Sequence, residues 1–175
     1  LYSSLPQNWR IAVLRYFNPI GAHPSGMIGE ENDLNTSNIL PSIINIAKGK
    51  NKALKIYGND WDTPDGTCIR DYIHVLDVAE GHVLCLDYLL KNSSQYISLN
   101  LGTGSGTSVL ELVKTFESVN KVKIPYEFFP RRIGEAPIYI ADSNKAKLVL
   151  NWEPKRNLKE MCRDSWNWEK SRLIH

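Results

Sequence analysis

The sequence predicts an α/β fold, and three of its features lead to this prediction. Short and nearly continuous apolar runs, such as residues 11–17, are typical of strands buried on both faces of a parallel sheet. Other segments, such as residues 39–48, carry apolar side chains at helical spacing. Loops rich in Gly, Pro, Asn and Asp separate the two kinds of segment. Strands that alternate with helices favour βαβ crossovers and therefore an α/β architecture.

The first half of the chain opens with the strand over residues 11–17, which runs into a loop over residues 21–26. This loop is too rich in Gly and Pro to be helical. Asn38 is a suitable cap for a helix over residues 39–48, because its side chain can accept a hydrogen bond from a free amide of the first turn. A short strand over residues 54–57 then leads into the next loop.

The segment over residues 58–74 has an unusual composition. Its first half contains Asp65-Gly66, a dipeptide typical of tight turns. Its second half, Ile69-Arg-Asp-Tyr-Ile-His74, alternates as a short strand that places a cation beside an anion and has little apolar mass. Either this segment is a hairpin loop whose charges are solvated, or its composition serves a purpose other than core packing.

A helix and a strand follow this segment and lead to a glycine cluster. The helix is expected to begin at Asp77, its cap, and to end near residue 91, and the strand covers residues 97–101. Gly102-Thr-Gly-Ser-Gly106 and a helix that starts at Ser108 come next. A dinucleotide-binding loop has the spacing G-x-G-x-x-G and an acidic residue about 20 residues further on, and this cluster has neither. We therefore interpret it as a tight strand-to-helix turn.

The last part of the chain contains one more strand, over residues 126–129, and two more helices. A loop over residues 130–137 carries paired arginines. Asp142 is expected to cap a short helix that reaches residue 150. Asn157 stands three residues before a glutamate, the spacing of a capping box, and predicts the start of the final helix.

Composition excludes several classes of protein. The 175 residues fit one domain, and a net charge of +2 without a Lys/Arg run gives no argument for a nucleic-acid partner. No apolar run is long enough to span a membrane, and the four histidines show no metal-ligand pattern. The three scattered cysteines fit neither a disulfide framework nor a zinc site, so we expect buried thiols in a reducing compartment. The opening residues 1–5 are typical of the end of a helix, and we expect the chain to be a fragment.

Three arginines, Arg70, Arg131 and Arg132, lie beside glycine-rich loops. A guanidinium group can donate two parallel hydrogen bonds to phosphate oxygens. From the residues alone, the sequence therefore predicts an α/β domain that binds an anionic ligand.

Four motifs lead to a more specific interpretation than an anionic ligand. They are Arg15-Tyr-Phe-Asn-Pro-Ile-Gly-Ala-His-Pro-Ser-Gly26, the segment over residues 58–74, Asn100-Leu-Gly-Thr-Gly104, and Pro130-Arg-Arg-Ile-Gly134. In this order they resemble successive landmarks of the UDP-glucose 4-epimerase family, which belongs to the extended short-chain dehydrogenases/reductases. The resemblance runs from about residue 9 to about residue 168. It implies that residues 1–175 form one UDP-sugar-binding domain, the C-terminal part of such an enzyme, with the last strands of a Rossmann sheet.

The resemblance also implies what should lie elsewhere. Family members begin with an NAD-binding Rossmann domain, followed by a catalytic Ser/Thr and a Tyr-x-x-x-Lys motif, and no tyrosine here has a lysine four residues on. In the family, NAD takes a hydride from C4 of the sugar while the tyrosinate removes the hydroxyl proton. The 4-keto sugar then turns over and regains the hydride on its other face, which interconverts UDP-galactose and UDP-glucose. We expect no catalytic residue in this chain and no activity from it alone.

Several residues match the UDP-sugar site of the family. They are Asn18, Asn38, Ile39, Lys55, Tyr57, Arg70, Tyr72, Val109, Arg132, Glu135 and Tyr139. The resemblance gives Lys55 and Tyr57 to the uracil and the two arginines to the diphosphate. Lys55 replaces a smaller residue, so we expect its side chain to point away. Tyr16 and Phe17 match positions beside the nicotinamide of NAD.

Two of these positions bear on specificity. Glu135 stands where the family often has an aspartate that contacts the ribose, and its side chain is longer than that of the aspartate. Tyr139 matches a position beside C2 of the hexose, where a small residue leaves room for an N-acetyl group. The resemblance therefore implies a parent enzyme that accepts UDP-galactose and UDP-glucose and discriminates against UDP-N-acetyl sugars.

The expected whole is a cytoplasmic NAD-dependent isomerase of galactose metabolism that forms a homodimer and has no nucleic-acid, membrane or metal partner. Two alternatives remain open. The chain could be a standalone UDP-sugar-binding module with no chemistry of its own. It could also be part of a related nucleotide-sugar dehydratase or epimerase, although the long loops over residues 21–26 and 58–74 favour the 4-epimerase.

Overall fold

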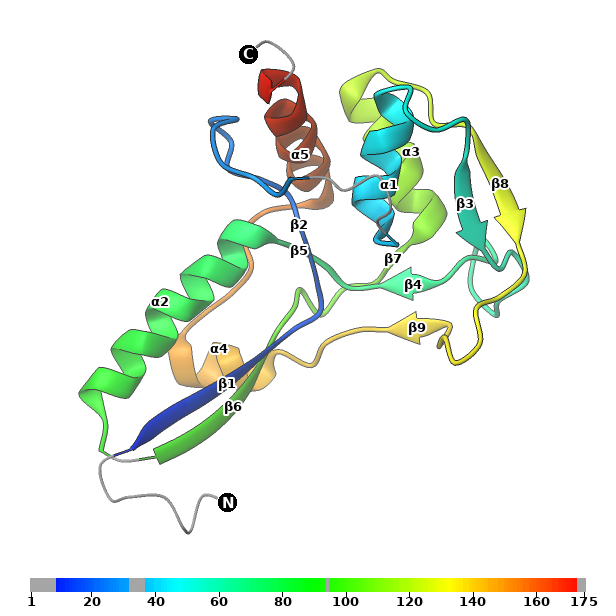
Figure 1. Ribbon diagram of the computed structural model, residues 1–175. Coiled ribbons are helices and arrows are strands. Elements are labelled where there is room, and N and C mark those ends of the chain that lie inside the picture. The colour runs from blue at the N-terminus through cyan, green and yellow to red at the C-terminus, as the bar shows by residue number, and fades with distance from the viewer. Residues whose placement is uncertain (1–8, 32–36, 94, 173–175) are drawn as a thin grey trace.

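The computed structural model describes residues 9–31, 37–93 and 95–172, so the helix end expected over residues 1–5 lies outside the described residues. The α/β class is confirmed: strands alternate with helices along the chain (Figure 1). In chain order the elements are β1 (Arg10–Tyr16), β2 (Asn18–Ile20), α1 (Ile39–Ala47), β3 (Leu54–Tyr57), β4 (Ile69–Arg70), β5 (Tyr72–His74), α2 (Val75–Lys91), β6 (Gln95–Leu101), β7 (Thr107–Ser108), α3 (Val109–Asn120), β8 (Tyr126–Phe129), β9 (Ile138–Tyr139), α4 (Asn144–Leu150) and α5 (Leu158–Arg172).

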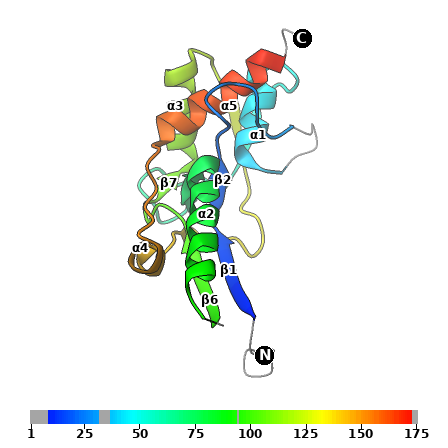
Figure 2. The ribbon, with the colours of Figure 1, turned by 90° about the vertical axis from the view of Figure 1, so that its left-hand side faces the viewer.

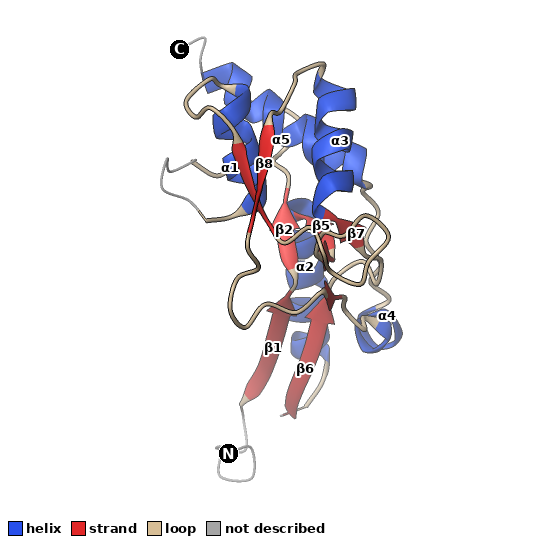
Figure 3. Ribbon diagram, turned by 90° about the vertical axis from the view of Figure 1, so that its right-hand side faces the viewer, coloured by secondary structure: helices blue, strands red, loops and turns tan. Residues whose placement is uncertain are grey.

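The first part of the molecule is the parallel pair β1 and β6, in which Arg10 lies opposite Gln95 and Tyr16 lies opposite Leu101. Helix α2 packs against both strands and α4 packs against β6. Figure 3 shows α2 behind the two strands, and Figure 2 shows it running along them. The core of this part joins the sheet to both helices and contains Ile73, Val78, Cys85, Ile97, Leu99, Leu101, Ala146, Leu150 and Trp152.

The second part consists of α1, α3 and α5 together with the parallel pair β3 and β8 (Figure 1). The apolar faces of the three helices meet in one core, in which Ile43, Leu112 and Phe116 are fully buried. The ring of Phe116 and that of Trp166 in α5 form a T-shaped pair, with the ring centroids 5.9 Å apart. Burial of such side chains supplies most of the stabilisation of a small domain.

The segment over residues 69–74 connects the two parts, and it is not the single strand that the sequence predicted. It splits at Asp71: β4 pairs with β7 and β9, whereas β5 pairs with β2. The hypothesis of solvated charges is wrong for the second half of the segment, because Asp71 is fully buried, whereas Asp60 and Asp62 in the first half are exposed. A fully buried carboxylate requires hydrogen-bond partners, and Asp71 has four of them.

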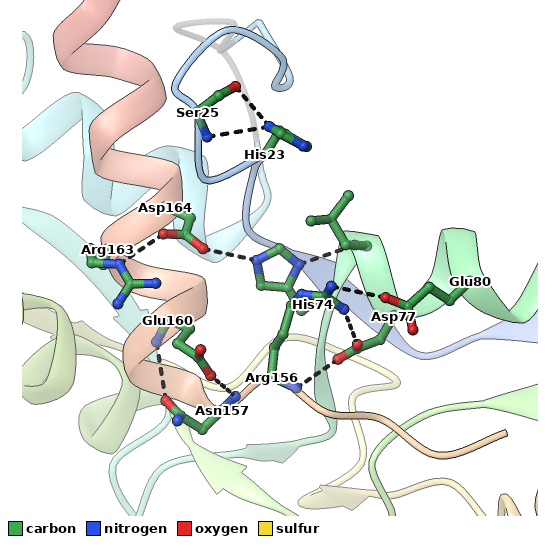
Figure 4. A network of polar contacts seen from close by, with 11 residues as sticks. His23, Ser25, His74, Asp77, Glu80, Arg156, Asn157, Glu160, Arg163 and Asp164 are labelled. Carbon is green, nitrogen blue, oxygen red and sulfur yellow. Dashed lines mark hydrogen bonds and ion pairs between the residues drawn. The ribbon is translucent and has the colours of Figure 1, made fainter.

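The start of α2 corrects one predicted cap. His74, not Asp77, is the N-cap, because its Nδ1 accepts a hydrogen bond from the amide of Leu76 at 3.0 Å. Asp77 is fully buried and instead accepts from the backbone amide and the guanidinium of Arg156. This ion pair, 79 residues apart in the sequence, joins the start of α2 to the loop before α5 (Figure 4).

The same contacts fix the state of His74. Because Nδ1 accepts a hydrogen bond, Nε2 carries the proton of the neutral ring and donates it to Asp164 of α5, 3.4 Å away (Figure 4). Burial lowers the pKa of His74 below its ordinary value, although Asp164 acts in the opposite direction. His74 is therefore a neutral link between α2 and α5.

The other caps follow the sequence more closely. Ser108 caps α3 by accepting from the amide of Glu111 at 3.0 Å. Asn157 and Glu160 form the predicted capping box, with reciprocal hydrogen bonds of 2.8 and 3.1 Å. Asn38 holds the N-cap position of α1 without a side-chain capping hydrogen bond. The N-cap of α4 is the serine after Asp142, so that prediction was wrong by one residue.

Membrane-spanning helices and metal-binding clusters are both absent from the described residues. Within residues 9–31, 37–93 and 95–172, no helix is both long and apolar enough to cross a membrane. The same residues contain no group of three or more His, Cys, Asp or Glu side chains that could hold a metal ion. The three cysteines are buried free thiols, as predicted: Cys68, Cys85 and Cys162.

Candidate functional site

A polar cavity of about 780 Å³ lies between α1, β3, β4 and the loop after β8. Every residue that the sequence assigned to the UDP-sugar, with the exception of Tyr139, lines this cavity. These residues are Asn18, Asn38, Ile39, Lys55, Tyr57, Arg70, Tyr72, Val109, Arg132 and Glu135. They come from seven different segments of the chain, so the fold itself brings them together.

A second, more apolar cavity of about 510 Å³ adjoins the first. The two share Asn18, Asn38, Ile39 and Tyr72 as a common wall. Phe17 lines the second cavity, but Tyr16 lines neither. A ligand that extends from one cavity into the other would therefore have one end in polar surroundings and the other in apolar surroundings.

Arg70 and Glu135 face each other in the polar cavity. The Nη2 atom of Arg70 donates to Glu135 Oε1 at 3.0 Å, and Nη1 donates to the carbonyl of Ile69 at 2.8 Å. The other carboxylate oxygen, Glu135 Oε2, is buried and has no hydrogen-bond partner in the described part of the chain. A buried acceptor without a partner is costly. This oxygen is therefore available to a hydroxyl group of a ligand.

Arg132 contributes the second cation of the cavity. Its guanidinium lies 4.0 Å from the centroid of the Tyr57 ring, a cation–π distance, and the Tyr57 ring contacts Phe129. The ammonium of Lys55 lies over the ring of Phe129, at 5.2 Å from its centroid. The paired rings at the ends of β3 and β8 thus each have a cation over them.

Arg131 differs from its neighbour and does not line the cavity. Its guanidinium stacks over Trp61 at 4.1 Å, and its Nε donates to Asp60 at 2.7 Å. That hydrogen bond lowers the pKa of the Asp60 carboxyl. Arg131 therefore joins the loop after β3 to the loop after β8, and the two adjacent arginines have different surroundings.

One aromatic residue assigned to the nicotinamide contacts the tyrosine assigned to the sugar, and the other contacts α2. Tyr139, in β9, is exposed, and its ring stacks on Phe17 with the centroids 5.2 Å apart. The hydroxyl of Tyr16 lies 2.7 Å from Nε2 of His82. Nδ1 of His82 faces the carbonyl of Val78 and therefore carries the proton of a neutral ring. The Tyr16 hydroxyl then donates to Nε2 of His82.

The sequence did not assign two residues of this region. Cys68 lines the polar cavity, and burial raises the pKa of its thiol, so it is a neutral wall residue. Asp71 lies behind the cavity, between Arg70 and Tyr72. An acidic residue inside a predicted strand was the available signal for Asp71, but for the lone Cys68 the sequence offered none.

The glycine cluster is a tight turn, as predicted. The amides of Thr103 and Gly104 donate to the carboxylate of Asp71 at 2.8 and 2.9 Å. A Cβ atom on Gly102 would lie 2.7 Å from the same carboxylate and 2.4 Å from the Cβ of Ala141, so only glycine fits there. An internal carboxylate thus takes the hydrogen bonds that a phosphate would need.

Comparisons with known proteins place the chain among nucleotide-sugar enzymes. A family model described as GDP-mannose 4,6 dehydratase matches residues 6–165. The UDP-glucose 4-epimerase of Bacillus subtilis (strain 168) is 52% identical over 165 residues, which are 94% of this chain and 48% of that protein. The UDP-glucose 4-epimerase GEPI48 of Cyamopsis tetragonoloba is 50% identical over 162 residues, which are 93% of this chain and 46% of that protein.

Solved structures lead to the same group. The UDP-glucose 4-epimerase of Stenotrophomonas maltophila, with bound NAD and formylated UDP-arabinopyranose, has a TM-score of 0.93 and 45% identity over 96% of this chain and 50% of that one. The enzyme of Bifidobacterium longum, in complex with NAD+ and UDP, has a TM-score of 0.89 and 42% identity over 95% and 49%. The chain thus spans about half the length of the relatives it matches. Because the family model covers most of the chain, the chain belongs to the extended short-chain dehydrogenase/reductase family, on the branch that contains these 4-epimerases.

Proposed function

We propose that the chain is the UDP-sugar-binding C-terminal portion of a UDP-glucose 4-epimerase. The observation that carries this proposal is the polar cavity, which gathers ten of the residues assigned to the UDP-sugar, all except Tyr139, from seven segments. Relatives about 50% identical to this chain bear that name and are about twice as long. In the whole protein the reaction would interconvert UDP-galactose and UDP-glucose through a transient 4-keto sugar.

The cavity supports a specific placement of UDP. Arg70 and Arg132 bind the diphosphate, because guanidinium groups donate bidentate hydrogen bonds to phosphate oxygens. The uracil lies along β3 beside Tyr57, and Glu135 Oε2 accepts from a ribose hydroxyl. Since the Arg132 guanidinium covers the Tyr57 ring, it must move toward the diphosphate when the uracil takes that face. The hexose then extends beyond the residues that the two cavities share, Asn18 among them, into the apolar cavity.

NAD is proposed as the cofactor of the whole protein, and this chain provides little of its site. The amides of the Gly102 to Gly104 turn already bond to Asp71, so this turn does not fit a cofactor diphosphate. Tyr16 and Phe17 remain as contacts for the nicotinamide end. When bound, NAD supplies a reversible hydride acceptor. The chain has none of the catalytic side chains that the family requires, so it should not epimerise UDP-galactose alone.

One surface supports the proposal that an NAD-binding portion completes the protein. The outer edge of β1 has no strand partner in the described part of the chain, although the edge of a sheet is a template for pairing. Beside it, α2 exposes Val83, Leu86 and Leu90, which are 62%, 57% and 63% accessible. An apolar helix face next to a free parallel edge is what remains when a doubly wound sheet is divided. We propose that the other strands of a Rossmann sheet pair with β1.

The alternatives differ from this proposal in what accompanies the cavity. A standalone UDP-sugar-binding module would have the same cavity but no NAD-binding portion upstream. A related nucleotide-sugar dehydratase or epimerase is consistent with the description of the family model, but the relatives at about 50% identity favour the 4-epimerase. Locating the start of the encoding reading frame separates the first alternative, and the product formed by the full-length protein separates the second.

Titration calorimetry with UDP tests the proposed site. Arg132→Ala should weaken UDP binding about tenfold or more, because a charged hydrogen bond contributes roughly 1.5–3 kcal/mol. Arg131→Ala is the matched control: it removes the same charge one residue away, outside the cavity, and should change the affinity much less. Equal losses in both variants, or none in Arg132→Ala, would place the diphosphate elsewhere.

We also propose that the parent protein is a cytoplasmic homodimer. Three buried free thiols fit a reducing compartment. The dimer rests on the resemblance, and light scattering on the full-length protein tests it, since a monomer at working concentration would contradict it.

A further inference from the structure

We propose that Asp71 is a positioning residue of the UDP-sugar site, which it holds in shape from behind the polar cavity. This inference rests on the proposed function. Asp71 is fully buried, lines neither cavity and touches no proposed ligand group. Its two neighbours in the sequence, Arg70 and Tyr72, both line the polar cavity.

The backbone of Asp71 bonds to two further site residues. Its amide donates to the carbonyl of Tyr139 at 3.1 Å, and its carbonyl accepts from the amide of Asn18 at 3.0 Å. Asp71 is also the point at which the chain leaves the sheet of β4 and enters the pair of β5 with β2. A shift of this one residue would therefore displace side chains on both walls of the site.

The carboxylate of Asp71 prevents such a shift. Oδ1 accepts from the amide and the hydroxyl of Thr103, at 2.8 and 2.5 Å, and Oδ2 accepts from the amides of Gly104 and Ala141, at 2.9 and 3.1 Å. All four donors belong to segments distant in sequence. A carboxylate is the right group here, because it accepts four hydrogen bonds and donates none.

An amide in its place would fit poorly. In Asp71→Asn, one acceptor becomes an NH₂ donor that faces the N–H groups it should accept from, so at least one backbone amide loses its partner. The turn over residues 102–104 should then separate from β4. Arg70 would leave its position against Glu135, 3.0 Å away, and the diphosphate would lose one of its two cations.

The test is a double-mutant cycle with UDP, measured by calorimetry on the whole 175-residue chain. Asp71→Asn should weaken UDP binding about tenfold. In an Arg70→Ala background the same change should weaken UDP binding no more than about threefold, because Asp71 acts through the Arg70 guanidinium, which that background lacks. Thr103→Val removes only one of the four donors and should fold normally while losing affinity by a smaller factor. Asp77→Asn is the matched control, a fully buried carboxylate that bonds to Arg156 and lines neither cavity.

A second measurement reads the position of Arg70 without any ligand. In ¹⁵N NMR spectra, the guanidinium nitrogens of Arg70 should give separate signals in the original chain and in Asp77→Asn, because the pair with Glu135 restricts rotation. They should merge into an averaged signal in Asp71→Asn and, in part, in Thr103→Val. A chain that does not bind UDP but shows this pattern would refute the proposed function and support the positioning role. Unchanged Arg70 signals in Asp71→Asn, or additive losses of UDP affinity, would overturn the positioning role.

Discussion

The ion pair between Arg70 and Glu135 leads to the prediction that removing the charge of Glu135 strengthens the binding of a diphosphate. Without a ligand, the Glu135 carboxylate occupies one of the donors that a diphosphate needs. Replacing it by an uncharged side chain should therefore strengthen the binding of a bare diphosphate. We choose inorganic pyrophosphate as the ligand, because it has no ribose that could use Glu135.

The size of this effect follows from the exposure of the pair. A hydrogen bond between charged groups contributes roughly 1.5–3 kcal/mol when buried, and an exposed ion pair contributes about 0–1 kcal/mol. The side chains of Arg70 and Glu135 are 16% and 25% exposed, between these two cases. We take about 1 kcal/mol, which corresponds to an increase in pyrophosphate affinity of about fivefold.

The assay is a calorimetric titration of the chain and of Glu135→Gln with pyrophosphate at fixed ionic strength. Asp60→Asn is the control, because it makes the same change in net charge at a carboxylate that pairs with Arg131 outside the cavity. Its pyrophosphate affinity should change by less than about twofold, since exposed charges are largely screened. If Glu135→Gln binds pyrophosphate no better than Asp60→Asn does, the carboxylate does not compete for Arg70 and the reasoning is refuted.

Three further predictions concern stability and specificity. Burial lowers the pKa of His74 in the folded chain, so the unfolded chain binds its proton more readily, and stability should be fully present above about pH 6.5 and decline as the pH falls below it. Thermal unfolding at pH 7.5 and 5.5 checks this, and a His74→Gln variant with the same decline would contradict it. Phe116→Ala should lower the free energy of unfolding by about 3–5 kcal/mol, because it empties space in a fully buried position; urea titration measures this, and a loss below about 1 kcal/mol would contradict it. In the full-length protein, Tyr139→Ser should raise turnover of UDP-N-acetyl sugars relative to UDP-galactose, and an unchanged ratio would show that Tyr139 is not the gate.

Local patterns in the sequence predicted the elements whose signals are local. The strand β3 begins and ends where its apolar alternation does, and the capping box at Asn157 depends on residues three apart. The cap of α2 was mispredicted because Asp77 has the right residue type but a distant partner, Arg156. The division of residues 69–74 at Asp71 was missed for the same reason, since its cause lies in strands far away in the sequence.

Some features of the candidate site could likewise be predicted from the sequence, and others only from the structure. From the residues alone, three arginines beside glycine loops predicted an anionic ligand, but nothing distinguished Arg131 from Arg132. Only the structure shows that Arg131 joins two loops through Trp61 and Asp60, whereas Arg132 lines the cavity. The remaining site residues came from the resemblance to the 4-epimerase family, and the roles of those residues stay predictions. Asp71 escaped both approaches, because its importance depends on four donors that only the fold brings to it.

The most direct test of the central claim is a crystal structure of the 175-residue chain with UDP. The account predicts a diphosphate hydrogen-bonded to Arg70 and Arg132, a uracil along β3 beside Tyr57, and a ribose hydroxyl on Glu135. UDP bound at another place, such as the turn over residues 102–104, would contradict the account. A folded chain that shows no UDP in the polar cavity at a saturating UDP concentration would also contradict the account.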